Sequence, residues 1–286
     1  MKKNYRQFTR TIRFSNFLFI AMLSLGLVAL ANTAWAEAEA LHEEHSLAKQ
    51  SQNPVASLIS LPFENNATFN NGKEDDFVNI LNIKPVIPMG LTENWNWINR
   101  IIAPVIYSEQ TTPNDSAKFG IGDIIYQGFL SPAKPGKIIW GIGPQLNLPT
   151  GTERFTSDQW SLGPNGVVLT MPGQWVLGAI VGNVWSIGGY NGAEDVNFLT
   201  AQYFINYNME GGWYVSTAPI ITANWEADDS DDKWTVPFGG GIGRVFKIGK
   251  QPVNLKAAVY YSAIRPDNAS DWNLQFTWNF LFPKKK

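Results

Sequence analysis

The stretch Asp271–Phe282, DWNLQFTWNFLF, alternates large apolar side chains with amide and hydroxyl side chains. Because successive side chains of a β-strand point to opposite faces, this pattern predicts a strand with one aromatic face and one polar face. Two environments satisfy such a strand: a dry core with water outside, or lipid outside with a wet lumen. The rest of the sequence has to distinguish them.

The N-terminus predicts export. Basic residues precede the apolar run Phe17–Leu30, and Ala34-Trp35-Ala36 follows as a small-x-small cleavage pattern, so we expect residues 1–36 to be a cleaved signal peptide. The apolar run is shorter than the roughly 20 residues of a membrane-spanning helix. The chain has 0 Cys and only 16% charged residues, against about 25% in soluble domains. This composition favours a sheet protein that packing and backbone pairing stabilise.

Period-2 segments recur from Pro54 onward, separated by clusters of Gly, Pro, Asn and Asp and without a linker. Residues 37–53 lack such a pattern, and we expect them to be a flexible periplasmic lead-in. Residues 54–286 then form one domain of about twelve strands. The expected strands lie near residues 56–69, 77–88, 95–107, 119–130, 138–149, 161–170, 174–186, 197–208, 212–225, 233–247, 251–264 and 271–282.

The connections between these strands indicate the surroundings. If both termini lie on one side, the connections on that side are short, and those on the other side are mostly longer and richer in acid. An even number of strands with this asymmetry is typical of an outer-membrane barrel, and most Trp residues lie near strand ends, where an aromatic girdle would sit. We therefore predict an all-β fold, a transmembrane antiparallel up-and-down β-barrel of about twelve strands. An exported soluble barrel is the alternative.

Alternation also places charged and amide side chains on the lumen face. The candidates for a selectivity site are Lys84, Arg100, Asp123, Gln145, Gln202, Lys256 and Tyr260. Lys84, Arg100 and Asp123 fall on consecutive strands, so we expect them to cluster on one wall. Two interpretations remain open: a constriction that orients a small solute, or an internal salt bridge that fills the barrel.

The sequence offers little for catalysis or for cofactors. A barrel enzyme needs a general base, which is usually His, and both histidines, His42 and His45, precede the first strand. We therefore expect no enzyme and no cofactor. The acidic loop Glu226–Asp232 lacks the Gly and Glu spacing of a calcium loop, so its acids are only weak metal candidates: Asp228, Asp229, Asp231 and Asp232. The net charge of -2 gives no electrostatic case for nucleic acid.

Several segments resemble a known family, the outer-membrane proteins linked to the meta-pathway of phenol degradation, whose members are often labelled "transporter" or neuromedin U. The segments that carry the resemblance are Gln52–Asn66, Leu81–Leu91, Gly120–Ile124, Gly143–Gly151, Trp213–Ala227, Trp234–Leu255 and Phe280–Pro283. The resemblance implies an outer-membrane β-barrel that passes aromatic or other small compounds. It implies neither a particular solute nor a set of functional residues.

Together these observations predict a passive channel or transporter for small molecules, in particular aromatic or hydrophobic ones, in the outer membrane of a Gram-negative bacterium. The expected partners are outer-membrane lipid and lipopolysaccharide, the barrel-insertion machinery and a small-molecule solute. The alternative is a closed barrel with a structural or surface-interaction role. The sequence leaves open whether residues 37–52 enter the lumen as a plug.

Overall fold

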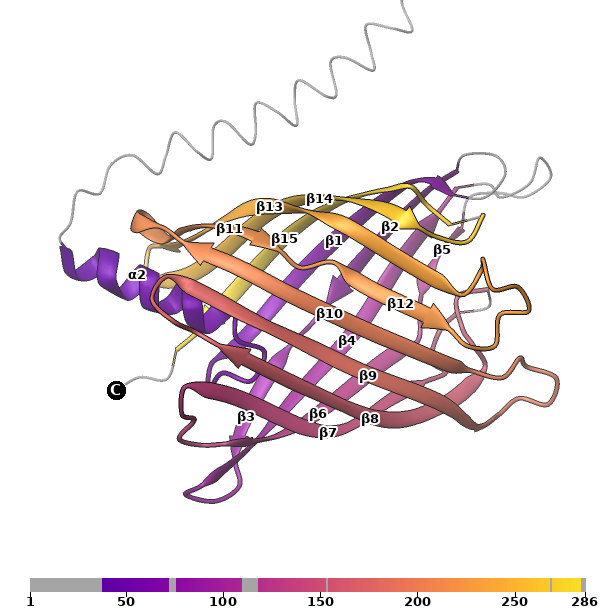
Figure 1. Ribbon diagram of the computed structural model, residues 1–286, viewed down its shortest axis with the longest axis horizontal. Coiled ribbons are helices and arrows are strands. Elements are labelled where there is room, and N and C mark those ends of the chain that lie inside the picture. The colour runs from indigo at the N-terminus through magenta and orange to yellow at the C-terminus, as the bar shows by residue number, and fades with distance from the viewer. Residues whose placement is uncertain (1–37, 72–75, 110–117, 153, 268, 284–286) are drawn as a thin grey trace, which may run out of the picture. The chain divides into compact units, whose positions relative to one another are not determined.

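The computed structural model describes residues 38–71, 76–109, 118–152, 154–267 and 269–283. The barrel and the helix residues that contact it lie in one compact unit, Leu41–Lys286. In the described part of the chain, fifteen β-segments form one antiparallel sheet, drawn in Figure 1. They are β1 (Ile59–Asn71), β2 (Asp76–Ile83), β3 (Val86–Gly90), β4 (Trp95–Ser108), β5 (Lys118–Ile121), β6 (Ile124–Pro132), β7 (Ile138–Leu148), β8 (Gln159–Thr170), β9 (Trp175–Gly189), β10 (Asn197–Asn208), β11 (Trp213–Thr217), β12 (Ile220–Asn224), β13 (Trp234–Ile248), β14 (Gln251–Ile264) and β15 (Trp272–Phe282).

The fifteen segments make twelve strands because three pairs of segments continue one another across short breaks: β2 with β3, β5 with β6, and β11 with β12. Two breaks contain a proline, Pro85 or Pro219, which has no backbone N–H to give to the ladder. Pairing with β1 continues within the break at Pro85, where the Lys84 amide donates to the Pro62 carbonyl (2.9 Å). The predicted twelve-stranded barrel is confirmed.

The sheet closes on itself. β1 pairs with β15 in continuous register from Ile59 opposite Phe282 to Phe69 opposite Trp272, and every other strand pairs with its neighbour along the chain. A closed sheet has no free edge, so its backbone amides and carbonyls are paired within the wall. Internal pairing of this kind is what a β-structure needs in hydrocarbon, where no water can satisfy backbone groups.

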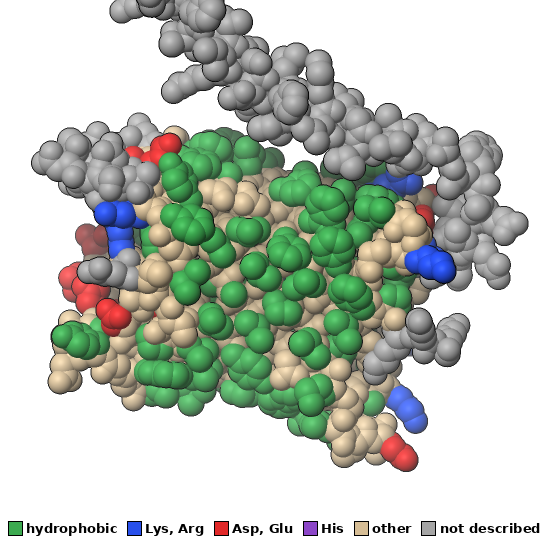
Figure 2. Space-filling model, turned by 180° about the vertical axis from the view of Figure 1, so that it is seen from behind, with side chains coloured by type: hydrophobic (Ala, Val, Ile, Leu, Met, Phe, Trp, Pro, Cys, Tyr) green, Lys and Arg blue, Asp and Glu red, His purple; other side chains and the backbone are tan. Residues whose placement is uncertain are grey.

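The outer face of the barrel is apolar. In β15, the side chains of Trp272, Leu274 and Phe276 are 45–49% exposed, whereas Gln275 and Asn279 on the opposite face of the strand are at most 8% exposed. Figure 2 shows the same feature at larger scale, because apolar side chains cover the barrel wall and charged side chains gather toward its two ends. The aromatic face of the closing strand therefore points outward, as predicted for a barrel in lipid.

The N-terminal lead-in differs from the prediction. Residues Ala38–Ser51 form the helix α2, where we had expected a flexible segment. Leu47 and Ala48 are buried, at 4% and 0% exposure, against the barrel. Two adjacent apolar residues are too few to give a helical period in the sequence, which explains the wrong prediction.

Two further sequence predictions concern the termini and the membrane. None of the helices that the structure describes is long and apolar enough to cross a membrane. The predicted signal peptide, residues 1–36, lies outside the described residues and stays a prediction, as does the role of the terminal residues 284–286.

Candidate functional site

One end of the barrel, where β1 begins and β15 ends, is occupied by the chain's own N-terminal segment. Leu47 and Ala48 of α2 pack with Tyr214 of β11, Val245 of β13 and Leu281 of β15. We call residues 47–58, from the end of α2 to the start of β1, the plug. The plug answers the question that the sequence left open, because its residues lie inside the wall of the barrel.

Hydrogen bonds fix the plug to several strands. The ammonium group of Lys49 donates to the carbonyls of Met171 (3.1 Å) and Gly173 (2.7 Å), in the turn before β9. The side chains of Gln52 and Asn208 exchange two hydrogen bonds, at 2.8 and 3.1 Å, at the end of β10. These contacts hold the plug to one side of the barrel, at the neighbouring strands β8, β9 and β10.

A further chain of hydrogen bonds links the plug to β14. The amide nitrogen of Asn254 donates to Ser51 Oγ (3.2 Å), and the Tyr214 hydroxyl donates to Asn254 Oδ1 (2.7 Å). Because Asn254 lies on the inner face of β14, this strand holds the plug directly.

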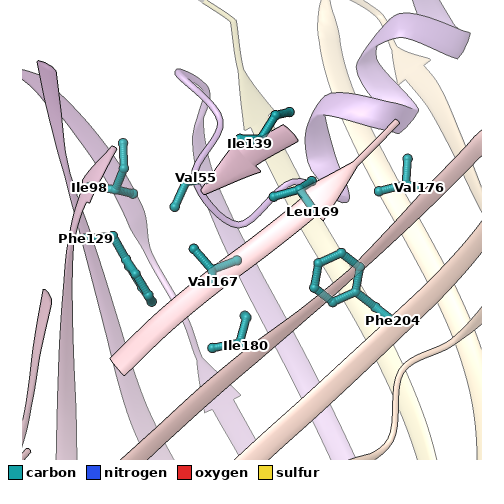
Figure 3. Close-up of a cluster of buried hydrophobic side chains, with 9 residues drawn as sticks. All are labelled: Val55, Ile98, Phe129, Ile139, Val167, Leu169, Val176, Ile180 and Phe204. Carbon is teal, nitrogen blue, oxygen red and sulfur yellow. The ribbon is translucent and has the colours of Figure 1, made fainter. Parts of the chain in front are cut away.

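An apolar cluster fills part of the lumen beside the plug. Val55 of the plug belongs to a cluster with side chains from six strands, and Figure 3 shows it among Ile98, Phe129, Ile139 and their neighbours. The members of this cluster are Val55, Ile98, Phe129, Ile139, Val167, Leu169, Val176, Ile180 and Phe204. The cluster occupies part of the lumen, so plug and cluster together narrow the barrel.

A cavity of about 190 Å³ lies next to the plug and forms the candidate site. Its charged lining residues are Glu64 of β1, Arg100 of β4, Lys256 of β14, and Lys84 between β2 and β3. The Lys84 ammonium and the Glu64 carboxylate form an ion pair at 2.6 Å, with both side chains only 12% exposed. Three cations against one carboxylate leave the lining with a net charge of +2.

The register of the sheet places these groups on one wall. Thr277 of β15 stands opposite Lys256 on one side and opposite Glu64 on the other. Its hydroxyl oxygen is buried and, within the part of the chain that the structure describes, has no hydrogen-bond partner, although the side chain lines the cavity. The site therefore offers a free hydroxyl between a cation and the ion pair.

The apolar part of the lining comes from other elements. Ile180 of β9 and Phe204 of β10 face the cavity and also belong to the apolar cluster, and Val86 and Ala218 add to this surface. The cavity thus has a charged wall and an apolar wall, with amide side chains of the plug between them.

Four of the seven candidates predicted from the sequence, Lys84, Arg100, Gln202 and Lys256, line this cavity. The Gln202 amide donates to the Ala218 carbonyl (3.0 Å), at the break that precedes Pro219. Gln145 lies elsewhere on the inner face, where it accepts a hydrogen bond from Gln127 (2.8 Å), and Tyr260 is buried without lining the cavity.

Asp123 does not join Lys84 and Arg100, contrary to the clustering that we expected. It lies at the break between β5 and β6, where its carboxylate accepts hydrogen bonds from the Gly151 amide (2.9 Å) and from the amide and hydroxyl of Ser157 (both 2.7 Å). Partial burial acts to raise the pKa of Asp123, but these hydrogen bonds outweigh it and hold the pKa below its usual value. Asp123 anchors the loop between β7 and β8.

Glu64 and Thr277 also line the cavity, and neither was among the residues predicted from the sequence. The signal for Glu64 was present, because Pro62, Glu64 and Asn66 share the inner face of β1 with opposite parity to Leu61 and Phe63. A carboxylate on the inner face of the barrel needs a cation or water as its partner. For Thr277 the sequence indicates only that its side chain faces inward. Its place in the site depends on Glu64 and Lys256, which stand opposite it on the neighbouring strands.

The weak metal candidates gain no support from the geometry. In the described residues no group of three or more His, Asp or Glu side chains comes together in a way that could hold a metal ion. In the acidic loop, Asp229 accepts a hydrogen bond from the backbone amide of Asp231 (3.2 Å), which is ordinary loop geometry. The side chain of His42 lies outside the described part.

Comparisons with known proteins agree with this architecture. The sequence pattern of the family described as "Putative MetA-pathway of phenol degradation" matches residues 64–261, more than half of the chain. Among solved structures, the chain is similar to the COG4313 outer membrane channel from Pseudomonas putida F1, with a TM-score of 0.61 and 15% identity over 80% of this chain and 97% of that one. At this identity, the similarity supports the fold alone.

Two other solved structures are less similar. For outer membrane phospholipase A from Escherichia coli the TM-score is 0.41, with 14% identity over 80% of this chain and 97% of that one. For a FadL homologue from Pseudomonas aeruginosa it is 0.39, with 9% identity over 80% and 91%. Neither carries an argument about this chain. None of the curated proteins matches the sequence.

Proposed function

The chain belongs to the outer-membrane β-barrel family described as "Putative MetA-pathway of phenol degradation", and from this premise we propose that it is a channel for small molecules that its own plug narrows. The predicted family resemblance is confirmed. The solute passes through the lumen rather than reacting there, so we propose transport without catalysis. The barrel lies in the outer membrane of a Gram-negative bacterium, after export by the signal peptide and insertion by the barrel-insertion machinery.

The observation that carries this proposal is the cavity of about 190 Å³ inside a closed barrel with an apolar outer face. A barrel that served only as a scaffold would have no need of several ionisable side chains in its interior, because burying a charge costs several kcal/mol even when it is paired. Channels, in contrast, use charged and amide side chains to orient a solute at the narrowest point.

Planar-bilayer conductance of the refolded mature chain tests the proposal. Because Val55 belongs to the apolar cluster, a deletion that removes the plug has to extend beyond α2, so the variant lacks residues 37–57. We expect small or rare current steps from the intact chain and larger ones from the deletion. Correctly folded protein that gives no current in either form would exclude a channel.

The second candidate function is a closed barrel with a structural or surface-interaction role. It is favoured by the apolar cluster, whose nine members fill part of the lumen as a protein core would. The deletion variant separates the two functions, since a lumen filled by wall side chains stays closed to ions when the plug is absent.

A further inference from the structure

We propose that the cavity beside the plug binds a small organic anion, a molecule with one carboxylate group and a flat apolar body. This inference deepens the proposed channel function, because it names the chemical class of the solute. It rests on the distribution of charge, of unpartnered donors and of apolar surface around one cavity.

The charge is the first argument. The Glu64 carboxylate already has a cation, Lys84, at 2.6 Å. Among the described residues, neither the Arg100 guanidinium nor the Lys256 ammonium has a hydrogen bond or an ion pair, although both side chains are partly buried and line the cavity. Glu64 attracts both of these cations as well, but one carboxylate cannot neutralise three cations. The excess positive charge attracts an anion more strongly than it would in water, because the local dielectric is lower.

The donors are the second argument. A carboxylate has two oxygens that accept hydrogen bonds, and it binds best where several donors converge. The ammonium of Lys256, the guanidinium of Arg100 and the unpartnered hydroxyl of Thr277 are donors on one wall of the cavity. A cationic solute would meet the same groups and be repelled.

The apolar wall is the third argument. Ile180 and Phe204 line the cavity on strands β9 and β10, away from the cations on β4 and β14. A volume of about 190 Å³ exceeds the ~150 Å³ at which an apolar protein cavity accommodates benzene. A single ring with one carboxylate therefore matches both the size and the two-sided lining.

Binding of benzoate and of benzylammonium to the folded chain in detergent tests the proposal. The two probes share a ring and differ in the sign of their charge. Saturation-transfer NMR followed by equilibrium dialysis measures affinity without requiring conduction. We expect saturable binding of benzoate and at least about tenfold weaker binding of benzylammonium, because the lining of the cavity carries a net positive charge.

The variants are Arg100→Gln, Lys256→Gln and the double variant, which lowers the net charge of the lining from +2 to 0. The matched control is the double variant Lys134→Gln and Lys137→Gln, which removes the same charge from the exposed turn between β6 and β7. Heat-modifiable migration on gels verifies that each variant is folded. We expect the lumen double variant to bind benzoate at least about tenfold more weakly, and the control to bind it unchanged.

The outcomes separate the two proposals. Folded wild-type chain that shows no saturable benzoate binding, or a folded lumen double variant that binds as tightly as wild type, overturns the anion site. If the double variant does not fold, the single variants decide in the same way. Benzoate binding together with a permanently closed barrel overturns the channel and leaves the anion site standing.

Discussion

Replacing Leu47 by Ala tests whether the plug closes the barrel. Leu47 is 4% exposed and packs against Tyr214, Val245 and Leu281. Truncating a buried Leu to Ala costs about 2–5 kcal/mol, and the lower part of this range suits a position at the end of the barrel, where neighbours can relax. A loss of about 2–3 kcal/mol in docking raises the ratio of undocked to docked plug roughly 30- to 150-fold, at 1.4 kcal/mol for each factor of ten.

Single-channel recording in planar bilayers measures this ratio as the fraction of time spent at high conductance. We expect brief openings in Leu47→Ala that reach the conductance of the chain without residues 37–57. Ser46→Ala is the matched control, because Ser46 is exposed on the same helix and, among the described residues, its hydroxyl accepts a hydrogen bond from Gln50 of α2 (3.2 Å) and from no strand. Equal conductance in the intact and the deleted chain would refute the reasoning, because the plug would then not obstruct the lumen.

Three further predictions concern the wall of the barrel. Glu64→Gln leaves Lys84 buried without its partner, so we expect the free energy of unfolding in urea to fall by about 3–5 kcal/mol. Adding Lys84→Met should restore most of this loss. A double variant no more stable than Glu64→Gln alone would argue against a pairwise effect. Phe276→Lys, in the middle of β15, should lower the free energy of unfolding in lipid vesicles by about 2–4 kcal/mol, whereas Ile264→Lys, at the end of β14, should lower it by about 0–1 kcal/mol. Equal losses would mean that this face does not contact lipid. The pKa of Asp123 is depressed in the folded chain, so its stabilisation of Gly151 and Ser157 should be fully present above the ordinary carboxyl pKa and be lost as the pH falls through the folded value. Hydrogen exchange of the Gly151 and Ser157 amides measures this stabilisation. Asp123→Asn should remove its pH dependence.

The barrel was predictable because its signal is local. The alternation in β15 appears in the sequence and again in the exposure of Trp272 and Phe276 against Gln275. The number of strands follows from repeated segments and turn residues, and the breaks at Pro85 and Pro219 interrupt pairing without adding a turn. Such features depend on residues that are close together in the sequence, so the sequence alone is enough to predict the strands and their number.

The site was only partly predictable because it depends on register. Alternation gives the face of a residue and says nothing of its height in the barrel. Lys84 and Arg100 reach the cavity, whereas Asp123, on the correct wall, stands at the level of a loop. The plug was harder still, since Gln52 and Asn208 are 156 residues apart and nothing near either one indicates the other.

The plug and the proposed anion site meet on β14. Asn254, which donates to Ser51 of the plug, and Lys256, which lines the cavity, are successive residues on the inner face of that strand. A solute can shift the plug only if it binds the docked and undocked forms with different affinity, and the effect must be reciprocal. If an anion at Lys256 weakens the docked form, the chain without residues 37–57 should bind benzoate more tightly than the intact chain by the same factor by which benzoate promotes opening. Equal affinities, measured by equilibrium dialysis, would mean that plug and solute act independently and that passage needs an opening that the solute does not itself promote.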